Sequence, residues 1–155
     1  MELGDILSEE SVIVCTDLKS KREVLERLAR QASEITGHET SAIFTALNDR
    51  EALGSTGLGN GIAIPHGRLS GLSGVTAVFA RLMHPVDFDA MDDQPVDLVM
   101  MLLAPPGAGA DHLKALARCA RMLRTEAAVQ QLRSSEDPQV LHDVLTQPLA
   151  AHQAA

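Results

Sequence analysis

The chain has 155 residues, the length of one ordinary domain, and its hydrophobic fraction of 45% is enough for a single core. It has no Trp or Tyr, so it lacks the main aromatic platforms on which nucleic-acid bases stack, and its net charge of −8 disfavours binding to nucleic acid or to an anionic membrane surface. No run of roughly 18 or more apolar residues and no signal peptide are present, so we expect a cytoplasmic protein with no direct membrane insertion.

The first part of the chain predicts one strand, two helices and a loop. The apolar stretch Val12–Val14 predicts a short strand. Ser20 is a good N-cap residue, and apolar residues then recur at helical spacing until Gly37, so a helix is expected between them. The same signals predict a second helix between residues 40 and 54. Residues 55–61 contain too much glycine for a helix or a regular strand and are expected to form a loop.

Three apolar stretches in the middle of the chain predict strands. Residues 62–64 are briefly extended, and the runs 75–82 and 96–103 have the composition and the length of strands. The last run is apolar almost throughout, as expected of a buried central strand. The stretch 84–94 between the two long strands is expected to form an exposed hairpin or loop.

The C-terminal part predicts two further helices. One opens at Asp111 and His112 and turns its regularly spaced Leu and Ala residues inward, and a later one covers residues 138–146. The tail 148–155 has no periodic apolar face and is expected to be frayed. Because strands and helices mix without strict alternation, we predict an α/β fold with a single domain, over residues 1–147, in which α-helices flank a mixed central β-sheet.

The segment 54–68, which reads GSTGLGNGIAIPHGR, concentrates the polar chemistry of the chain. Its glycines let the backbone approach a ligand closely, and successive N–H groups of such a loop can surround an anion. On the pattern alone, a purely structural glycine loop is the favoured interpretation. The loop is neither a Walker A motif nor a dinucleotide-binding motif, because Gly-Lys-Ser/Thr does not close it and no helix follows. The candidate residues for binding a phosphoryl group are Ser55, Thr56, Gly59, Asn60 and Gly61.

The imidazole of His66 changes this balance, because the proline before it should present the ring at a strand end. A neutral histidine nitrogen is a competent nucleophile at physiological pH, and the N–P bond that it forms keeps the phosphoryl group transferable. Such transfer depends on positioning and on charge stabilisation, for which Arg50 and His112 are the candidate groups. A zinc site of His66, His112 and Asp111 is the main alternative, but no close ligand spacing supports it and Arg50 would oppose a cation, so no metal is expected.

Two separated motifs resemble a known family. The Arg-Glu pair at residues 50–51, the glycine-rich stretch 54–61, the Pro-His-Gly at residues 65–67 and the helix-opening His112 are similar, in type and order, to the pattern of one group of carrier proteins. These are the IIA components, of the fructose/mannitol type, of the bacterial phosphoenolpyruvate-dependent sugar phosphotransferase system. The resemblance covers most of the chain. GLGNGIAIPHGRL and GDILSEESVIV are most similar to the nitrogen regulatory branch, and the lack of an attached IIB or IIC domain favours a regulatory role.

The resemblance implies a histidine phosphocarrier. His66 would accept the phosphoryl group from an HPr-like carrier protein, through Nε2 as tele-phosphohistidine, with Arg50 and His112 in the same pocket. Ser55 or Thr56 would hydrogen-bond either the phosphoryl oxygens or the unreactive ring nitrogen, and no cofactor is implied. The phosphorylation state would select regulatory partner proteins in nitrogen, ion or carbon metabolism. As an alternative, the chain would pass the group to a separate IIB protein of sugar transport.

The remaining polar residues receive a structural interpretation. Cys15 and Cys119 are far apart in sequence and are expected to be free, packed thiols. Arg118, Arg121 and Arg124 follow one side of a predicted helix; a solvated helix face is favoured, and docking of an acidic or phosphorylated partner protein stays open. The histidines outside the motifs are expected at the surface: His38, His84, His142 and His152.

Overall fold

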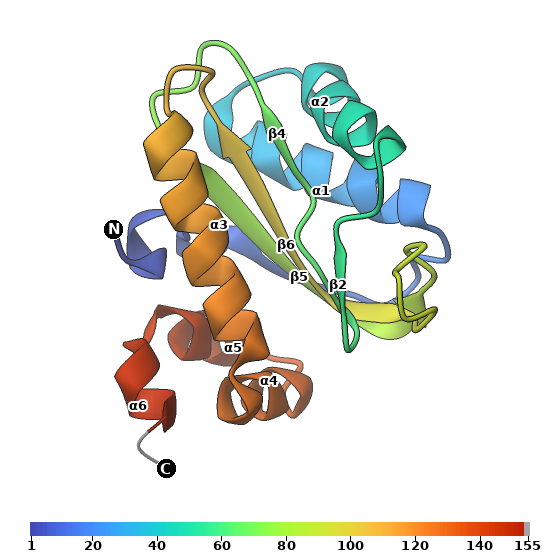
Figure 1. Cartoon of the computed structure of the whole chain (residues 1–155), viewed down its shortest axis with the longest axis vertical. Coiled ribbons are helices and arrows are strands. Elements are labelled where there is room, and N and C mark those ends of the chain that lie inside the picture. Colours follow the sequence, from blue (N-terminus) through green and yellow to red (C-terminus); the bar gives the residue numbers. More distant parts are fainter. Residues whose placement is uncertain (154–155) are drawn as a thin grey trace.

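The computed structural model describes residues 1–153 and contains one central β-sheet (Figure 1). Its strands are β1 (Val12–Cys15), β2 (Gly57–Gly59), β3 (Ile62–Ala63), β4 (His66–Arg68), β5 (Thr76–Val86) and β6 (Val96–Ala104). The strand order is β1-β5-β6-β3-β2, and β4 also pairs with β6. β1 runs parallel to β5, β5 and β6 are antiparallel, and β3 and β4 run parallel to β6. The predicted mixed sheet is therefore confirmed.

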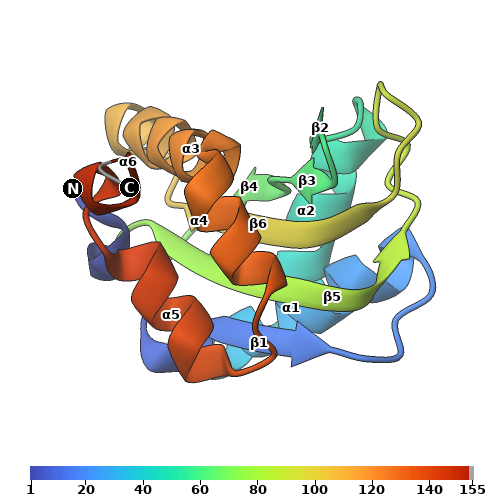
Figure 2. The same cartoon turned by 90° about the horizontal axis from the view of Figure 1, so that it is seen from below.

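Helices cover both faces of the sheet (Figure 2). The described helices are α1 (Lys21–Thr36), α2 (Thr40–Ala52), α3 (Gly109–Arg124), α4 (Glu126–Arg133), α5 (Pro138–Thr146) and α6 (Leu149–Gln153), with 3-10 turns η1 (Leu3–Asp5) and η2 (Glu9–Ser11). The apolar residues of α1 and α2 form one core cluster with the sheet, and those of α3, α4 and α5 form a second cluster on its other side. This arrangement confirms the predicted α/β fold. No helix within residues 1–153 has the length and apolar composition needed to cross a membrane.

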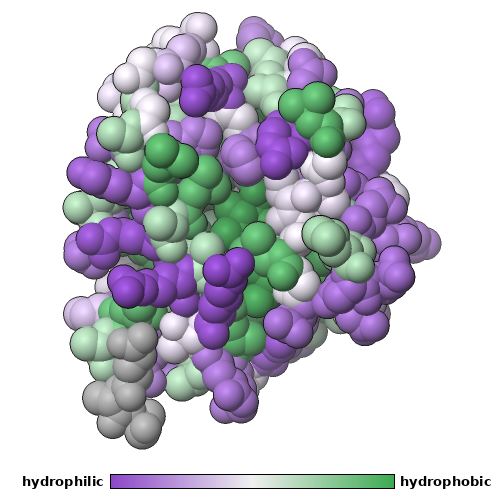
Figure 3. Space-filling model, viewed as in Figure 1, coloured by the Kyte–Doolittle hydropathy of each residue, from purple (hydrophilic) through white to green (hydrophobic). Residues whose placement is uncertain are grey.

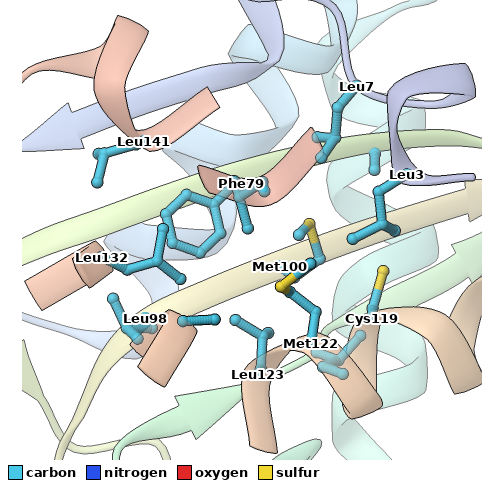
Figure 4. Packing of buried hydrophobic residues seen from close by; sticks show 14 of the residues in the cluster. Leu3, Leu7, Phe79, Leu98, Met100, Cys119, Met122, Leu123, Leu132 and Leu141 are labelled. Carbon is cyan, nitrogen blue, oxygen red and sulfur yellow. The ribbon is translucent and has the colours of Figure 1, made fainter. Parts of the chain in front are cut away.

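β6 contributes to both core clusters, because successive residues of a strand point to opposite faces. Leu98 and Met100 belong to the cluster beneath α3, whereas Val99 and Met101 belong to the cluster beneath α1 and α2. Figure 4 shows the first cluster, in which the ring of Phe79 packs among Leu and Met side chains. The prediction of a buried central strand in this part of the chain is confirmed.

The predicted ends of two helices are confirmed by their capping geometry. The hydroxyl oxygen of Ser20 accepts a hydrogen bond of 3.1 Å from the N–H of Glu23 at the start of α1. Gly37 ends this helix with a φ of 77°, in the left-handed region that glycine adopts easily. At α5, Pro138 occupies the first turn and the Asp137 carboxylate caps it.

Two stretches that we expected to be loops contain strand. In the stretch 84–94, β5 continues through Val86, and both Phe88 and Ala90 are buried. Buried and exposed residues alternate from Val86 to Ala90, so this part covers the core and the predicted exposure is wrong there. The predicted hairpin is confirmed, because the stretch connects the antiparallel strands β5 and β6. Residues 57–59 form β2, which pairs with β3 in an irregular register of the kind that glycine permits.

The C-terminal region contains two helices that we did not predict, α4 and α6. The buried residues of α4 are Ala128, Val129 and Leu132, which lie on one helical face. We expected the tail to be frayed, but its first part forms α6, where His152 is buried and its Nε2 atom lies 2.9 Å from the carbonyl oxygen of Val144. The surface position predicted for His152 is therefore wrong. Residues 154–155 lie outside the described part of the chain.

The two cysteines are packed side chains, as predicted. Cys15 and Cys119 are both buried and free. Burial raises the pKa of the Cys119 thiol to about 12, and burial also raises the pKa of Cys15. Both thiols are therefore protonated at neutral pH and are poor nucleophiles.

Candidate functional site

His66 stands at the start of β4, on the edge of the sheet beside β6. β3 and β4 pair in parallel with this same strand, with Ile62 opposite Leu98 and His66 opposite Leu102. Between them, the carbonyl of Pro65 accepts a hydrogen bond of 2.9 Å from the N–H of Leu102. Pro65, which has no N–H of its own, thus interrupts the pairing with β6 between β3 and β4, but both strands keep the same register against β6. The position predicted for His66, at a strand end, is confirmed.

Gly67 lets α2 pack closely over β4. A Cβ atom added at Gly67 would lie 3.0 Å from the carbonyl oxygen of Ala46, so a side chain would push α2 away. Arg50 follows Ala46 by one helical turn on α2. The close packing at Gly67 therefore brings Arg50 to the surface from which His66 projects.

The ring of His66 is half-buried, and its Nδ1 atom lies 2.9 Å from the carbonyl oxygen of Ile64. A carbonyl oxygen only accepts hydrogen bonds, so this contact places the proton of the neutral ring on Nδ1. Nε2 then keeps its lone pair and is the nitrogen available for reaction. We had expected Ser55 or Thr56 to bond either the unreactive nitrogen or a phosphoryl group; the main chain of Ile64 holds that nitrogen instead.

His112, in the first turn of α3, faces His66. Their ring centroids are 5.5 Å apart and the rings meet edge to face at 74°. The side chain is 6% exposed, and its pKa is lowered, first by burial and then by the charges of His66 and Arg68. The ring is therefore neutral at pH 7, and its Nε2 atom is buried with no hydrogen-bond partner among residues 1–153. Because an unpaired buried polar atom is costly, this nitrogen is suited to bond a ligand oxygen.

The two imidazoles share one pocket of about 530 Å³ with two guanidinium groups, which we call the histidine pocket. Arg50 from α2 and Arg68 from β4 both line it. Nη1 of Arg50 donates a hydrogen bond of 2.9 Å to the Gly54 carbonyl, which restrains the side chain and uses one of its five N–H donors. The structure thus brings together the three groups that the sequence indicated, Arg50, His66 and His112.

The lining of the histidine pocket also includes residues that were not predicted from the sequence, among them Arg68, Leu53 and Leu113. Arg68 follows His66 by two residues, and alternate residues of a strand share a face, so this spacing is the signal that could have found it. Leu53 and Leu113 are 85% and 69% exposed and form an apolar rim. Exposed aliphatic side chains around a polar pocket are typical of a surface that contacts another protein.

Ser55 and Thr56 are bonded elsewhere and do not line the histidine pocket. The Ser55 hydroxyl donates to the carbonyl of Phe88 at 2.6 Å. The hydroxyl and the N–H of Thr56 both donate to the buried carboxylate of Glu51, which also contacts Nζ of Lys21 at 2.8 Å. These contacts fix the loop between α2 and β2.

Gly59 ends β2, Asn60 and Gly61 form the turn between β2 and β3, and none of the three lines the histidine pocket. The N–H of Asn60 donates to the Asp92 carboxylate at 2.9 Å, and Arg133 donates to the Asn60 carbonyl at 2.7 Å. Asn60 and Gly61 have φ values of 57° and 81°, as a tight hairpin turn requires. This part of the loop therefore ties β2 and β3 to α4 and to the loop after β5.

The charge of the histidine pocket suits an anion. Its lining has two permanently cationic side chains, Arg50 and Arg68, against one carboxylate, that of Asp49. Asp111, the carboxylate considered for a metal site, does not line this pocket and is exposed on α3. Within residues 1–153, no group of three or more His, Cys, Asp or Glu side chains is placed to hold a metal ion.

The lowered pKa of His112 predicts that stability depends on pH. An unfolded histidine has a pKa of about 6.5, so below that pH the unfolded chain binds a proton that folded His112 binds less readily. The free energy of unfolding should therefore fall as the pH falls below about 6.5, and His112 should contribute at most about 1.4 kcal/mol per pH unit to this slope. Urea unfolding between about pH 5 and pH 8 measures it.

The His112→Gln variant isolates this contribution, because its side chain does not titrate. Its stability should fall less steeply with decreasing pH than that of the wild type. The matched control is His84→Gln, on the exposed end of β5, which should keep the wild-type slope. Equal slopes in the wild type and in His112→Gln would contradict the prediction.

Comparison with known proteins places this site in a family. The sequence model described as "Phosphoenolpyruvate-dependent sugar phosphotransferase system, EIIA 2" matches residues 5–147. The chain is 49% identical over 150 residues to a nitrogen regulatory protein of Bradyrhizobium diazoefficiens, covering 97% of this chain and 98% of that protein. It is 39% identical over 125 residues to a fructose-specific EIIA component of Haloferax volcanii, covering 81% of this chain and 80% of that protein.

A solved structure is also similar. It is the crystal structure of nitrogen regulatory protein IIA-Ntr from Neisseria meningitidis, with a TM-score of 0.86 and 34% identity, covering 93% of this chain and 99% of that one. The chain belongs to the EIIA type 2 family of the phosphoenolpyruvate-dependent sugar phosphotransferase system.

Proposed function

We propose that this chain is a histidine phosphocarrier, in which Nε2 of His66 accepts a phosphoryl group from the phosphohistidine of an HPr-like protein. The observation that carries the proposal is the contact between Nδ1 and the Ile64 carbonyl, which leaves Nε2 free in a pocket whose lining includes Arg50 and Arg68. Nε2 forms the new N–P bond while the N–P bond of the donor breaks, and the donor imidazole leaves with the electron pair. Because such transfer depends on positioning and charge stabilisation, neither a cofactor nor a metal ion is required.

The histidine pocket supplies this charge stabilisation. Arg50 and Arg68 oppose the negative charge of the phosphoryl oxygens, and a guanidinium can bind two oxygens at once. The buried Nε2 atom of His112, in the tautomer that carries its proton, donates to a further oxygen. As Nε2 of His66 attacks, positive charge develops on the ring, and the Ile64 carbonyl stabilises the proton on Nδ1.

The glycine-rich loop has a positioning role in this proposal. Thr56 is held by Glu51, and the Gly54 carbonyl between them restrains Arg50. The loop thus fixes the arginine without contributing its own hydroxyl groups to the phosphoryl group.

Phosphorylation changes the electrostatics of a surface that partner proteins can contact. It adds about −1.5 to −2 charge inside the rim formed by Leu53 and Leu113. A partner that docks on this rim therefore meets a different potential in the two forms, so the modification can select partners. The similarity to nitrogen regulatory proteins supports a regulatory role, which we propose to act in the cytoplasm and in nitrogen, ion or carbon metabolism. The similarity to a fructose-specific EIIA component supports the alternative, transfer to a separate IIB protein of sugar transport.

The proposal is tested by the intact mass of the chain after incubation with phosphoenolpyruvate, Enzyme I and an HPr-like carrier. We expect one acid-labile phosphoryl group per chain, and no gain in mass with any carrier would overturn the proposal. Addition of a IIB protein then separates the two roles. Rapid discharge supports sugar transport, whereas a persistent label with phosphorylation-dependent binding of a target supports regulation.

Replacement of Arg50 by Ala should slow phosphoryl transfer by about tenfold or more, because a donor to the developing oxygen charge is lost. Arg50→Lys should recover only part of the rate, since an ammonium group cannot bind two oxygens in the same geometry. Rapid-quench measurement of the first turnover gives the rates. Arg30→Ala, an exposed change on α1, is the control, and a wild-type rate in Arg50→Ala would place Arg50 outside the reaction.

A further inference from the structure

The outer face of α3 carries a row of basic side chains. Lys114, Arg118, Arg121 and Arg124 are all exposed and recur at helical spacing. They are four of the 13 lysines and arginines in a chain of net charge −8, and Asp111 is the one acidic residue of this helix. We call these four residues the basic row. A positive face is therefore concentrated on one helix of an acidic protein.

Most of the basic row is not neutralised within the described part of the chain. Arg118 lies 3.4 Å from Glu2, in an exposed pair that contributes little to stability. Among residues 1–153, Lys114, Arg121 and Arg124 have no carboxylate oxygen within 4.0 Å. Three cations are thus available to a partner.

Small apolar side chains line a groove on this face of α3. Ala117 and Ala120 lie next to the basic side chains and, with them, border this groove of about 660 Å³. Small side chains let a second helix approach α3 closely, while the longer basic side chains flank it. The row from Lys114 to Arg124 spans about 15 Å at the rise of an α-helix, which matches about three turns of a partner helix.

An apolar strip runs beside the basic row. Leu113, Leu116 and Ala120 follow each other at helical spacing on the side of α3 that faces the sheet edge, and the first two also line the histidine pocket. Figure 3 shows apolar surface beside α3 with hydrophilic side chains along its outer side. Apolar and basic surface thus run in parallel along the helix, a pattern that an amphipathic partner matches.

We propose that α3 is a docking surface for an acidic amphipathic helix of a partner protein, whose aliphatic side chains cover the apolar strip and whose carboxylates pair with the basic row. Charge complementarity selects this occupant. A nucleic acid fits less well, because the net charge of the chain repels a dense polyanion and the phosphate backbone offers no aliphatic surface to the strip. The surface does not require phosphorylation of His66, so it extends beyond the proposed function.

The test uses two fluorescein-labelled helical peptides, one with Leu on one face and Glu on the other, and one with Lys in place of every Glu. Fluorescence anisotropy should show the Glu peptide binding at least about tenfold more tightly than the Lys peptide, and less tightly as salt is added. The double variant Arg121→Glu/Arg124→Glu should lose this binding. The matched control, Lys19→Glu/Arg30→Glu, makes the same change of net charge on or next to α1, across the sheet, and should bind as the wild type does.

Equal binding of the Glu peptide by the two double variants would overturn the proposal, and so would displacement of the peptide by a short DNA duplex at lower concentration. The His66→Ala variant distinguishes this surface from the phosphocarrier site. This variant should bind the Glu peptide as tightly as the unphosphorylated wild type does. We expect this result whether the proposed phosphocarrier function is right or wrong. Loss of peptide binding in His66→Ala would show that the peptide requires the imidazole of the phosphocarrier site, and it would contradict docking on the basic row and the apolar strip alone.

Discussion

The His66→Ala variant should accept no phosphoryl group, because it lacks the one imidazole whose Nε2 atom is both unprotonated and placed in the histidine pocket. Incubation with phosphoenolpyruvate, Enzyme I and an HPr-like carrier should increase the intact mass of the wild type and leave that of the variant unchanged. The alanine removes a half-buried side chain at the surface, so the fold should be retained. Circular dichroism of the unlabelled variant checks this.

The matched control is His84→Ala, which removes an exposed imidazole from β5 without touching the pocket. It should be labelled at the wild-type rate. A second informative variant is His112→Ala, which should still be labelled but more slowly, because it removes a donor and not the nucleophile. Labelling of His66→Ala at the wild-type rate would refute the assignment of the phosphosite.

Replacement of Glu51 by Ala should lower the free energy of unfolding by about 3 kcal/mol, the low end of the range for breaking a buried ion pair. The Glu51 carboxylate is 3% exposed and accepts from both the N–H and the hydroxyl of Thr56, and its Oε2 atom lies 2.8 Å from Nζ of Lys21. The variant leaves the ammonium group and two donors without this acceptor, and leaving buried donors unpaired is costly. Urea unfolding measures the loss.

The chain offers a matched control for this prediction. Arg22 and Glu26 on α1 also approach to 2.8 Å, but their side chains are 71% and 50% exposed. Glu26→Ala should therefore cost less than about 0.5 kcal/mol, as exposed pairs at this spacing do. The double variant Lys21→Met/Glu51→Leu should recover part of the loss seen in Glu51→Ala, because it removes both buried charges. A small effect of Glu51→Ala, equal to that of Glu26→Ala, would show that burial adds nothing to the Lys21–Glu51 pair.

The loss of Glu51 should also lower the rate of phosphoryl transfer. This residue holds Thr56, and the loop between them carries the Gly54 carbonyl that restrains Arg50. In Glu51→Ala, phosphoryl transfer should therefore slow even at temperatures at which the variant is fully folded.

Local signals were sufficient to predict several of the elements around the candidate site, whereas the motif resemblance was needed to single out Arg50, His66 and His112. Ser20 and Gly37 mark the ends of α1, and the apolar run of β6 marks the centre of the sheet, because capping and strand patterns act between neighbours in sequence. Pro65 likewise indicates only the conformation of the residues next to it, including His66. What no local signal contains is the parallel pairing of β3 and β4 with β6, which brings His66 next to α3. The motif resemblance supplied that long-range information.

The hydrogen-bond partners in the glycine-rich loop could not be predicted from the sequence. A hydroxyl group donates to whichever acceptor the fold places nearest, and sequence does not show which one that is. For Ser55 this acceptor is the carbonyl of Phe88, from a segment that we expected to be an exposed loop. For Thr56 it is Glu51, whose buried carboxylate pairs with Lys21 from another helix. Arg68, by contrast, could have been predicted from the sequence, because it lies on the same strand face as His66.

The contact between His66 and the Ile64 carbonyl has a genetic consequence as well as a chemical one. The atom that decides which ring nitrogen is free to react in the proposed transfer belongs to the main chain, and every amino acid carries the same carbonyl group. Substitution of the Ile64 side chain therefore cannot delete this acceptor. We therefore expect the regioselectivity of the proposed reaction to be robust to mutation at position 64 and to change only if the path of the backbone through Pro65 changes.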